Sequence, residues 1–296
     1  MNLYIVESPL QLLCAYEAIS VNKNETYQLL IRQTGRGLND KHLISCANRL
    51  GLDYKIFVLH TTNIYMGLLR NFFLWCSLYF KKYEKVYFGS VYSSALSFIN
   101  NFIKKKEVIY LDDGAATLRA QFEMCNKEKN ICNLFTFFNI EPLQGQNITK
   151  HNFEKIKEKN KNYINEKIYF IGQPVHAMKG FSEEDYIRCV REVANKCNEG
   201  DFLHYIPHRV EDLNKINNIP NIKVIKSNVP VEMYFMENKG SIPKEIYSCY
   251  STALITLPLL FYGIKSIAIK NKNNKISEID FMYEYFLNDN ISVIEL

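Results

Sequence analysis

Short apolar runs alternate with amphipathic segments along most of the chain. Residues 2–6 form a β-prone run, and Ser8 and Pro9 follow it as a helix N-cap and a first helical residue, so the chain opens as strand, turn and helix. Further strands are predicted at residues 27–31, 54–59, 85–88 and 108–111, and further helices at 41–50, 64–80 and 93–103. This alternation predicts a parallel sheet with helices on both faces.

The pattern is interrupted once and then restarts. Residues 147–167 are dominated by Lys, Asn and Glu, which predicts a linker or an exposed connecting helix. Strands are then expected at residues 167–171, 202–206, 222–225, 246–249 and 266–269, and helices at 183–197, 230–237 and from near 253 to 262. We therefore expect two Rossmann-like α/β domains, residues 1–155 and 156–296, that face a central cleft.

Composition supports a globular protein of this size. The chain has 296 residues, of which 47% are hydrophobic, enough to fill two cores. Its 36 Lys and Arg against 31 Asp and Glu make it only mildly basic, and no recognition motif indicates nucleic acid. Eight scattered cysteines without a C-x-x-C pair indicate reduced thiols in the cytoplasm and argue against a zinc site.

Two features bear on membranes. No basic segment precedes an apolar one at the start of the chain, so a secretory signal is not expected. The aromatic stretch 64–80 is interrupted by Arg70 and Asn71 and followed by Lys81 and Lys82, which is unsuited to a spanning helix. Two alternatives stay open: a helix packed on the sheet, or one whose exposed face makes a peripheral contact with a membrane or a partner.

Two adjacent carboxylates and a glycine, Asp112-Asp113-Gly114, follow the apolar run 108–111. Open α/β sheets build their sites at the carboxyl ends of strands, so a carboxylate here is a candidate general base. The pair could instead hold a metal against a diphosphate, or simply form a strand-to-turn junction. Successive strand side chains point in opposite directions, so we expect only one of the two to face the site.

Pro207 and His208 repeat this layout after the run 202–206. A histidine at a strand end is a candidate acid for a reaction that removes one proton and donates another. The alternative is an ordinary surface or capping histidine. The neighbouring Arg209 places a positive charge beside the histidine, which suits phosphate binding.

Other polar residues lie at expected helix starts. Ser251 and Thr252 precede the helix near Ala253, where hydroxyls and free N–H groups can bind phosphate, although ordinary N-capping uses the same residues. Glu232 lies early in the expected helix 230–237. It either complements the helix dipole or accepts hydrogen bonds from ribose hydroxyls.

Six short motifs follow one another along nearly the whole chain: Ser8-Pro9-Leu10-Gln11, Asp112-Asp113-Gly114, Gly172-Gln173-Pro174, Pro207-His208, Val231-Glu232 and Tyr250-Ser251-Thr252-Ala253. In this order and rough spacing they resemble the bacterial lipooligosaccharide sialyltransferases of glycosyltransferase family 52, relatives of the capsule polysialyltransferases. Two positions depart from the family pattern. Arg209 stands where the family has proline, and Thr252 where it has a second serine.

The resemblance implies a GT-B glycosyltransferase with an acceptor-side domain 1–155 and a donor-side domain 156–296. It implies inverting transfer of sialic acid from CMP-sialic acid, without metal or other cofactor. The acceptor would be a terminal galactose-type hydroxyl of an oligosaccharide or glycolipid, in lipooligosaccharide or capsule. Relatives also suggest a homodimer.

The resemblance assigns roles to single residues as well. Asp112 would deprotonate the acceptor, with Asp113 as the second choice, and His208 would protonate the departing phosphate. The remaining donor-binding residues would be Gly172, Gln173, Pro207, Glu232, Ser251 and Thr252.

Other functions stay open at this point. A related enzyme could transfer glucose or N-acetylglucosamine from another nucleotide sugar. A sugar-nucleotide epimerase would consume the donor without an acceptor. A binding protein on the same scaffold would bind CMP and turn nothing over, although the retained Asp112 and His208 argue against it.

Overall fold

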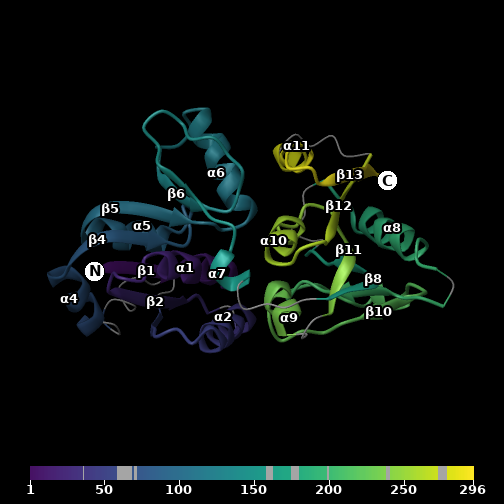
Figure 1. Ribbon diagram of the computed structural model, residues 1–296, viewed down its shortest axis with the longest axis horizontal. Helices are drawn as coiled ribbons and strands as arrows, with labels where there is room; N and C mark the ends of the chain where they lie inside the picture. Colours follow the sequence, from purple (N-terminus) through teal and green to yellow (C-terminus); the bar gives the residue numbers. More distant parts are fainter. Residues whose placement is uncertain are drawn as a thin grey trace. The chain divides into compact units, whose positions relative to one another are not determined.

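The computed structural model describes residues 1–35, 37–58, 69, 72–157, 163–174, 180–198, 200–237, 241–272 and 279–296. The chain divides into two compact units, Met1–Lys155 and Ile156–Leu296. Each unit is built on its own sheet with helices packed against it (Figure 1). Among the described residues, none of the helices is long and apolar enough to cross a bilayer.

The first unit contains a seven-stranded parallel sheet in the order β3-β2-β1-β4-β5-β6-β7. Its strands are β1 (Asn2–Val6), β2 (Tyr27–Gln33), β3 (Lys55–Val58), β4 (Lys82–Phe88), β5 (Lys104–Leu111), β6 (Asn133–Thr136) and β7 (Ile148–Lys150). Its helices are α1 (Pro9–Val21), α2 (Gly37–Leu50), α4 (Phe72–Phe80), α5 (Ser94–Phe102), α6 (Ala115–Cys125) and the short α7 (Glu154–Lys157), which continues into the second unit. Strand β1 is buried along its whole length because it has a strand on each side and helices on both faces.

The second unit contains a six-stranded parallel sheet in the order β10-β9-β8-β11-β12-β13. Its strands are β8 (Tyr163–Ile171), β9 (Leu203–Ile206), β10 (Ile222–Val224), β11 (Ser241–Ser248), β12 (Lys265–Lys270) and β13 (Ser292–Glu295). Its helices are α8 (Glu183–Ala194), a 3-10 turn at Ile216–Asn218, α9 (Val231–Glu237), α10 (Ala253–Leu260) and α11 (Asp280–Asn288).

Both sheets are doubly wound, and the first six strands of the first sheet follow the same order as the six of the second. In the first, the chain moves outward from β1 through β2 to β3 and then returns to the other side of β1 with β4. In the second, β8, β9, β10 and β11 repeat this path. Ligands of such sheets bind at the carboxyl ends of the strands where the direction reverses. A ligand site is therefore expected near the ends of β1 and β4 in the first sheet, and of β8 and β11 in the second.

The prediction of a linker or exposed helix at residues 147–167 is correct only in that the division between the two units falls within this segment. This segment contains β7, α7 and the first part of β8. Two of its apolar side chains, Phe153 and Ile156, are fully or almost fully buried. Within the described residues, β7 lies at the edge of the sheet and pairs with β6 alone, so it needs little apolar sequence.

Several element boundaries also differ from the prediction. Strand β5 begins at Lys104, four residues before the apolar run, because main-chain pairing with β4 tolerates exposed lysines. Helix α2 begins at Gly37 rather than at residue 41. Of the predicted aromatic helix 64–80, only Leu69 and α4 lie within the described residues.

Candidate active site

Asp112 directly follows β5 and is completely buried. Its Oδ1 accepts a hydrogen bond from Thr136 Oγ1 at 2.7 Å, and its Oδ2 accepts one from the Phe137 backbone N–H at 2.7 Å. Burial raises the pKa of Asp112 to about 7, against the opposing effect of these hydrogen bonds. A carboxyl that titrates near neutral pH has the proton affinity that suits a general base, but its two oxygens already have protein partners.

A buried imidazole lies beside Asp112. His151 Nε2 is 3.8 Å from Asp112 Oδ2, and its ring stacks on Phe135 with centroids 4.4 Å apart. Burial lowers the pKa of His151 to about 3, so the ring is neutral at physiological pH. Cys14, Asp112 and His151 form the one group among the described residues that could hold a metal ion. Their ligand atoms all lie within 4.8 Å of one another.

Asp113 is only half-buried and has different partners. Its Oδ1 accepts a hydrogen bond from Gln11 Nε2 at 2.6 Å, and its backbone N–H donates to Thr117 Oγ1 at 2.9 Å. Gln11 is 2% exposed, and its Oε1 accepts from the Glu7 backbone N–H at 2.7 Å. One glutamine of α1 therefore ties the end of β1 to the carboxylate that follows β5.

Gly89, immediately after β4, makes room for this glutamine. A Cβ atom added at Gly89 would lie 2.0 Å from Gln11 Oε1. The sequence indicated Gln11 only as part of a motif. Its contact with Asp113, 102 residues away, comes from the sheet order that brings β1, β4 and β5 together.

In the second unit, Gln173 lies at the point where the direction of the sheet reverses. It follows β8, and its Oε1 accepts hydrogen bonds from Ser248 Oγ at 3.2 Å and from the Tyr250 backbone N–H at 3.0 Å. Ser248 ends β11. Gln173 thus joins the two central strands at their carboxyl ends and fixes the segment that leads to Ser251.

His208 follows β9 on a loop that a carboxylate holds in place. The backbone N–H of His208 donates to Glu211 Oε2 at 2.9 Å, and Glu211 Oε1 accepts from the Tyr205 hydroxyl. The Tyr205 hydroxyl also lies 2.8 Å from that of Tyr186, which accepts from the Gln173 backbone N–H at 2.9 Å. We call Gln173, Tyr186, Tyr205 and Glu211 the β8–β9 network.

The β8–β9 network is largely buried, and this has electrostatic consequences. Tyr186 and Tyr205 are 0% exposed, and burial raises the pKa of both phenols well above the usual range. Burial also raises the pKa of Glu211 to about 7. Gly172 is buried beside this carboxylate, because an added Cβ would lie 2.3 Å from Glu211 Oε2.

Ser251 and Thr252 lie between β11 and α10 and are half-buried. Ser251 Oγ accepts a hydrogen bond from the Ala253 backbone N–H at 3.2 Å. Thr252 is the N-cap residue of α10 and makes no side-chain capping bond. The Ser251 hydroxyl therefore accepts a hydrogen bond from a backbone N–H at the start of α10, which is a structural role. The Thr252 hydroxyl makes no capping bond.

Glu232 lies in the first turn of α9 and is 7% exposed. Its Oε1 accepts a hydrogen bond from Thr256 Oγ1 of α10 at 2.7 Å. Burial raises the pKa of Glu232. The contact joins α9 to α10, and the predicted role in ribose binding stays a prediction.

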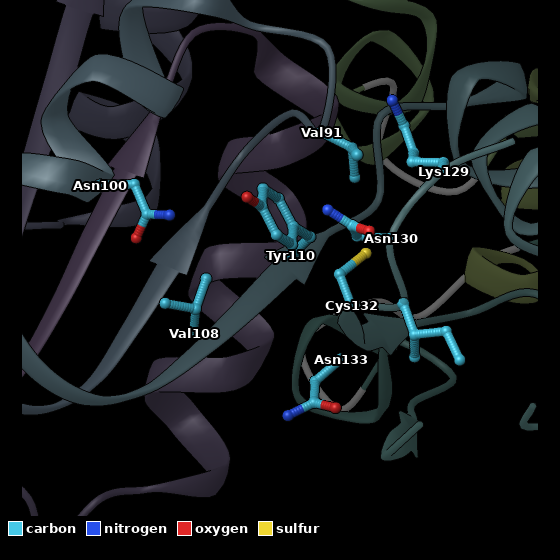
Figure 2. A pocket seen from close by; sticks show the side chains of 9 residues that line it. Val91, Asn100, Val108, Tyr110, Lys129, Asn130, Cys132 and Asn133 are labelled. Carbon is cyan, nitrogen blue, oxygen red and sulfur yellow. The ribbon is translucent and has the colours of Figure 1, made fainter. Parts of the chain in front are cut away.

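Unit 1 also has a hollow of about 430 Å³ away from the predicted residues. Figure 2 shows Tyr110 and Val108 of β5 on one side and the segment from Lys129 to Asn133 on the other. Tyr110 is two residues before Asp112, but neither carboxylate of the pair lines the hollow.

The structure thus connects some of the predicted residues and not others. Gln173 belongs to the β8–β9 network, which lies against Gly172, holds the His208 loop and is bonded to the Tyr250 backbone. Asp112 and Asp113 lie in the other unit with separate partners. Sequence reasoning missed Glu211. Its only local signal was its position, three residues after His208.

No protein-family model matches the chain, and no curated protein matches its sequence. The fold is similar to solved structures. A glycosyltransferase from Rickettsia africae ESF-5 is 10% identical with a TM-score of 0.51, covering 100% of this chain and 83% of that one. E. coli heptosyltransferase WaaC with ADP has 10% identity and a TM-score of 0.51, covering 100% and 93%. Anabaena Alr3699/HepE in complex with UDP and glucose has 9% identity and a TM-score of 0.52, covering 91% and 80%.

These similarities define the fold. The chain has the α/β architecture of GT-B proteins, with two Rossmann-like domains that each contain a parallel sheet.

Proposed function

We propose that this protein is a glycosyltransferase that moves a sugar from a nucleotide donor to a glycan hydroxyl. The observation that carries the proposal is the β8–β9 network, which joins the Gly172-Gln173 turn, where the second sheet reverses direction after β8, to the neighbouring His208 loop. Nucleotides bind doubly wound sheets at this position. The GT-B fold favours sugar transfer over other reactions of nucleotides.

The residue types suit a phosphate leaving group. In glycosyl transfer, positive charge develops on the sugar while negative charge builds on the departing phosphate. An imidazole and hydroxyl groups at the start of a helix stabilise that negative charge. His208 would protonate or hydrogen-bond the phosphate, and Ser251 and Thr252 would bind its oxygens.

Two observations about the base point in different directions. The resemblance and the raised pKa favour Asp112, whereas exposure favours Asp113, the only one of the pair that is not completely buried. Asn variants separate the two residues. The base variant should lose about 10²- to 10⁴-fold in rate, while a variant of the other carboxylate should change stability more than rate.

Two classes of donor remain in competition. The order of the six motifs supports CMP-sialic acid, with transfer to a terminal galactose-type hydroxyl of a bacterial surface glycan and without a metal. The similar structures support the broader class, because two of them contain ADP or UDP. A nucleoside diphosphate sugar, such as a glucose or N-acetylglucosamine donor, is therefore the second candidate.

A donor panel decides between them. The purified chain is incubated in EDTA with CMP-sialic acid and a labelled lactoside, and in parallel with UDP- and ADP-sugars. Sialylated product would establish the first donor and independence of metal, and transfer of another sugar would establish the second class. Donor consumption without an acceptor would indicate an epimerase, and nucleotide binding without turnover of any donor would refute the transferase.

The role of His208 is tested on the active donor. His208→Ala should lose about 10²- to 10⁴-fold in rate while the protein remains folded. Near-full activity in this variant would remove the histidine from the mechanism.

A further inference from the structure

Helix α4 has no charged side chain, since its nine residues are FFLWCSLYF. A surface helix usually has one apolar stripe and a polar opposite face. One face of α4 does pack into the core of the first unit. Trp75 is 4% exposed and lies edge-on to Phe57 with centroids 5.6 Å apart, and Leu78 is completely buried. The exposed residues outside that face are aromatic.

Those outer residues form an exposed aromatic surface. Phe72, Phe73, Tyr79 and Phe80 are 58%, 87%, 43% and 77% exposed. Phe73 and Phe80 are two helical turns apart and therefore lie on the same side of the helix. At roughly 200 Å² for each aromatic side chain, the four expose about 500 Å². A contiguous apolar patch of this size marks an interaction site on a protein surface.

Lysines border the aromatic surface. Lys81 and Lys82 directly follow Phe80, and Lys82 is paired in register with Lys104 where β4 and β5 begin. Lys104 Nζ lies 5.0 Å from the centre of the Tyr79 ring. Both Lys82 and Lys104 are exposed. Positive charge therefore lies next to the aromatic rings.

The nearby acid does not cancel this charge. Glu84 is paired with Lys106 through a 2.7 Å contact between Oε2 and Nζ, which leaves the other lysines in excess. Figure 1 shows α4 at the end of the first unit that carries the N-terminus, near the start of β1.

We propose that this face docks on an anionic lipid bilayer. The α4 surface consists of Phe72, Phe73, Tyr79, Phe80, Lys81, Lys82 and Lys104. Aromatic side chains enter the boundary between headgroups and acyl chains, while lysines are attracted to anionic headgroups. The proposed contact is peripheral, because only the exposed face of α4 meets the bilayer while Trp75 and Leu78 stay in the core of the first unit.

A second copy of the chain fits this surface less well. About 500 Å² is below the roughly 800 Å² per partner that a stable interface buries. A two-fold contact would also bring the lysines of both copies into one interface. An anionic bilayer offers an apolar boundary for the rings and negative headgroups for the lysines.

Flotation of the full chain with vesicles tests the proposal. The vesicles are phosphatidylcholine with or without phosphatidylglycerol, and no nucleotide sugar is present, so the result is independent of the proposed transfer reaction. We expect binding to the anionic vesicles that weakens as salt is added. Lys82→Gln with Lys104→Gln should lower that affinity by about 25-fold, roughly fivefold for each lysine.

A second pair of variants tests the rings. Phe73→Ser with Phe80→Ser should lower vesicle affinity at least tenfold, and the thermal midpoint should be maintained because both rings are exposed. Tyr262→Ser is the matched control, since Tyr262 is 96% exposed in the other unit and should not affect binding. No flotation of the wild type, or unchanged flotation of the phenylalanine pair, would overturn the proposal. Self-association that the phenylalanine pair abolishes, without vesicle binding, would assign the surface to a second copy instead.

Discussion

Replacing Gly172 by alanine tests whether the β8–β9 network positions the His208 loop. The added Cβ would lie 2.3 Å from Glu211 Oε2, 2.8 Å from the Tyr205 hydroxyl and 3.0 Å from Pro207 Cα. Ordinary van der Waals contact begins at 3.4 Å, so the carboxylate must move by about 1 Å. The Pro207 backbone atom cannot move aside as easily as a side-chain end.

The displacement has a calculable cost. A shift of about 1 Å lengthens the 2.9 Å hydrogen bond from His208 N–H beyond the useful range. Overpacking of this kind costs about 1–3 kcal/mol, and a lost hydrogen bond to a charged group costs about 1.5–3 kcal/mol. We expect Gly172→Ala to destabilise the second unit by about 3 kcal/mol. Misplacement of His208 by a similar distance should lower the rate by about 10²-fold.

Urea unfolding and steady-state kinetics on the active donor measure the two effects. Gly37→Ala is the control, because no atom of the described residues lies within 4 Å of a Cβ at that position and the change should be nearly neutral. Adding Glu211→Ala to Gly172→Ala removes the nearest of the three crowded atoms, so the two changes should be less than additive in the free energy of unfolding. Stability within about 0.5 kcal/mol of wild type, together with full activity in Gly172→Ala, would refute the reasoning.

Gln11→Ala should lower kcat about tenfold or more by releasing Asp113, and should leave nucleotide affinity unchanged in calorimetric titration; a loss of nucleotide affinity would contradict this. Burial favours the protonated form of Asp112, whose pKa is raised to about 7, so this stabilisation is complete below about pH 4 and is lost as the pH rises through about 7. Relative to Asp112→Asn, the free energy of unfolding of the first unit should therefore fall by about 3 kcal/mol between about pH 5 and 8, as followed by denaturant titration, and parallel pH profiles would show that the pKa is not raised. Glu211→Gln replaces one of two acceptor oxygens by a donor, so nucleotide affinity should fall about tenfold in the same titration, and unchanged affinity would separate the network from the donor site.

The fold could be predicted in large part because its strands are short, apolar and regularly spaced. β1 lies where the sequence placed it, and β9 differs from the predicted strand by one residue. β6 and β7 were missed. They contain four and three residues and lie toward the edge of the first sheet, so their apolar patterns are too short to be recognised.

The candidate site could be predicted only as a set of positions at the ends of strands. The burial of Asp112 depends on Thr136 and Phe137, which lie 24 and 25 residues away in sequence. The network around Glu211 depends on two tyrosines and a glutamine from three separate segments. Local sequence specifies these side chains but not their distances, which follow from the order of strands in the sheet.

The matching order of strands in the two sheets has an evolutionary consequence. Within the described residues, every strand pairs with strands of its own unit, and the division falls between Lys155 and Ile156. Exchange of gene segments at this point would leave the main-chain hydrogen bonding of both sheets intact. Under the proposed function, the half with the Gln173 turn could then be replaced by one with a different nucleotide preference while the half with the Asp112-Asp113 pair is inherited unchanged. Proteins of this architecture can therefore diversify by recombination of halves as well as by substitution.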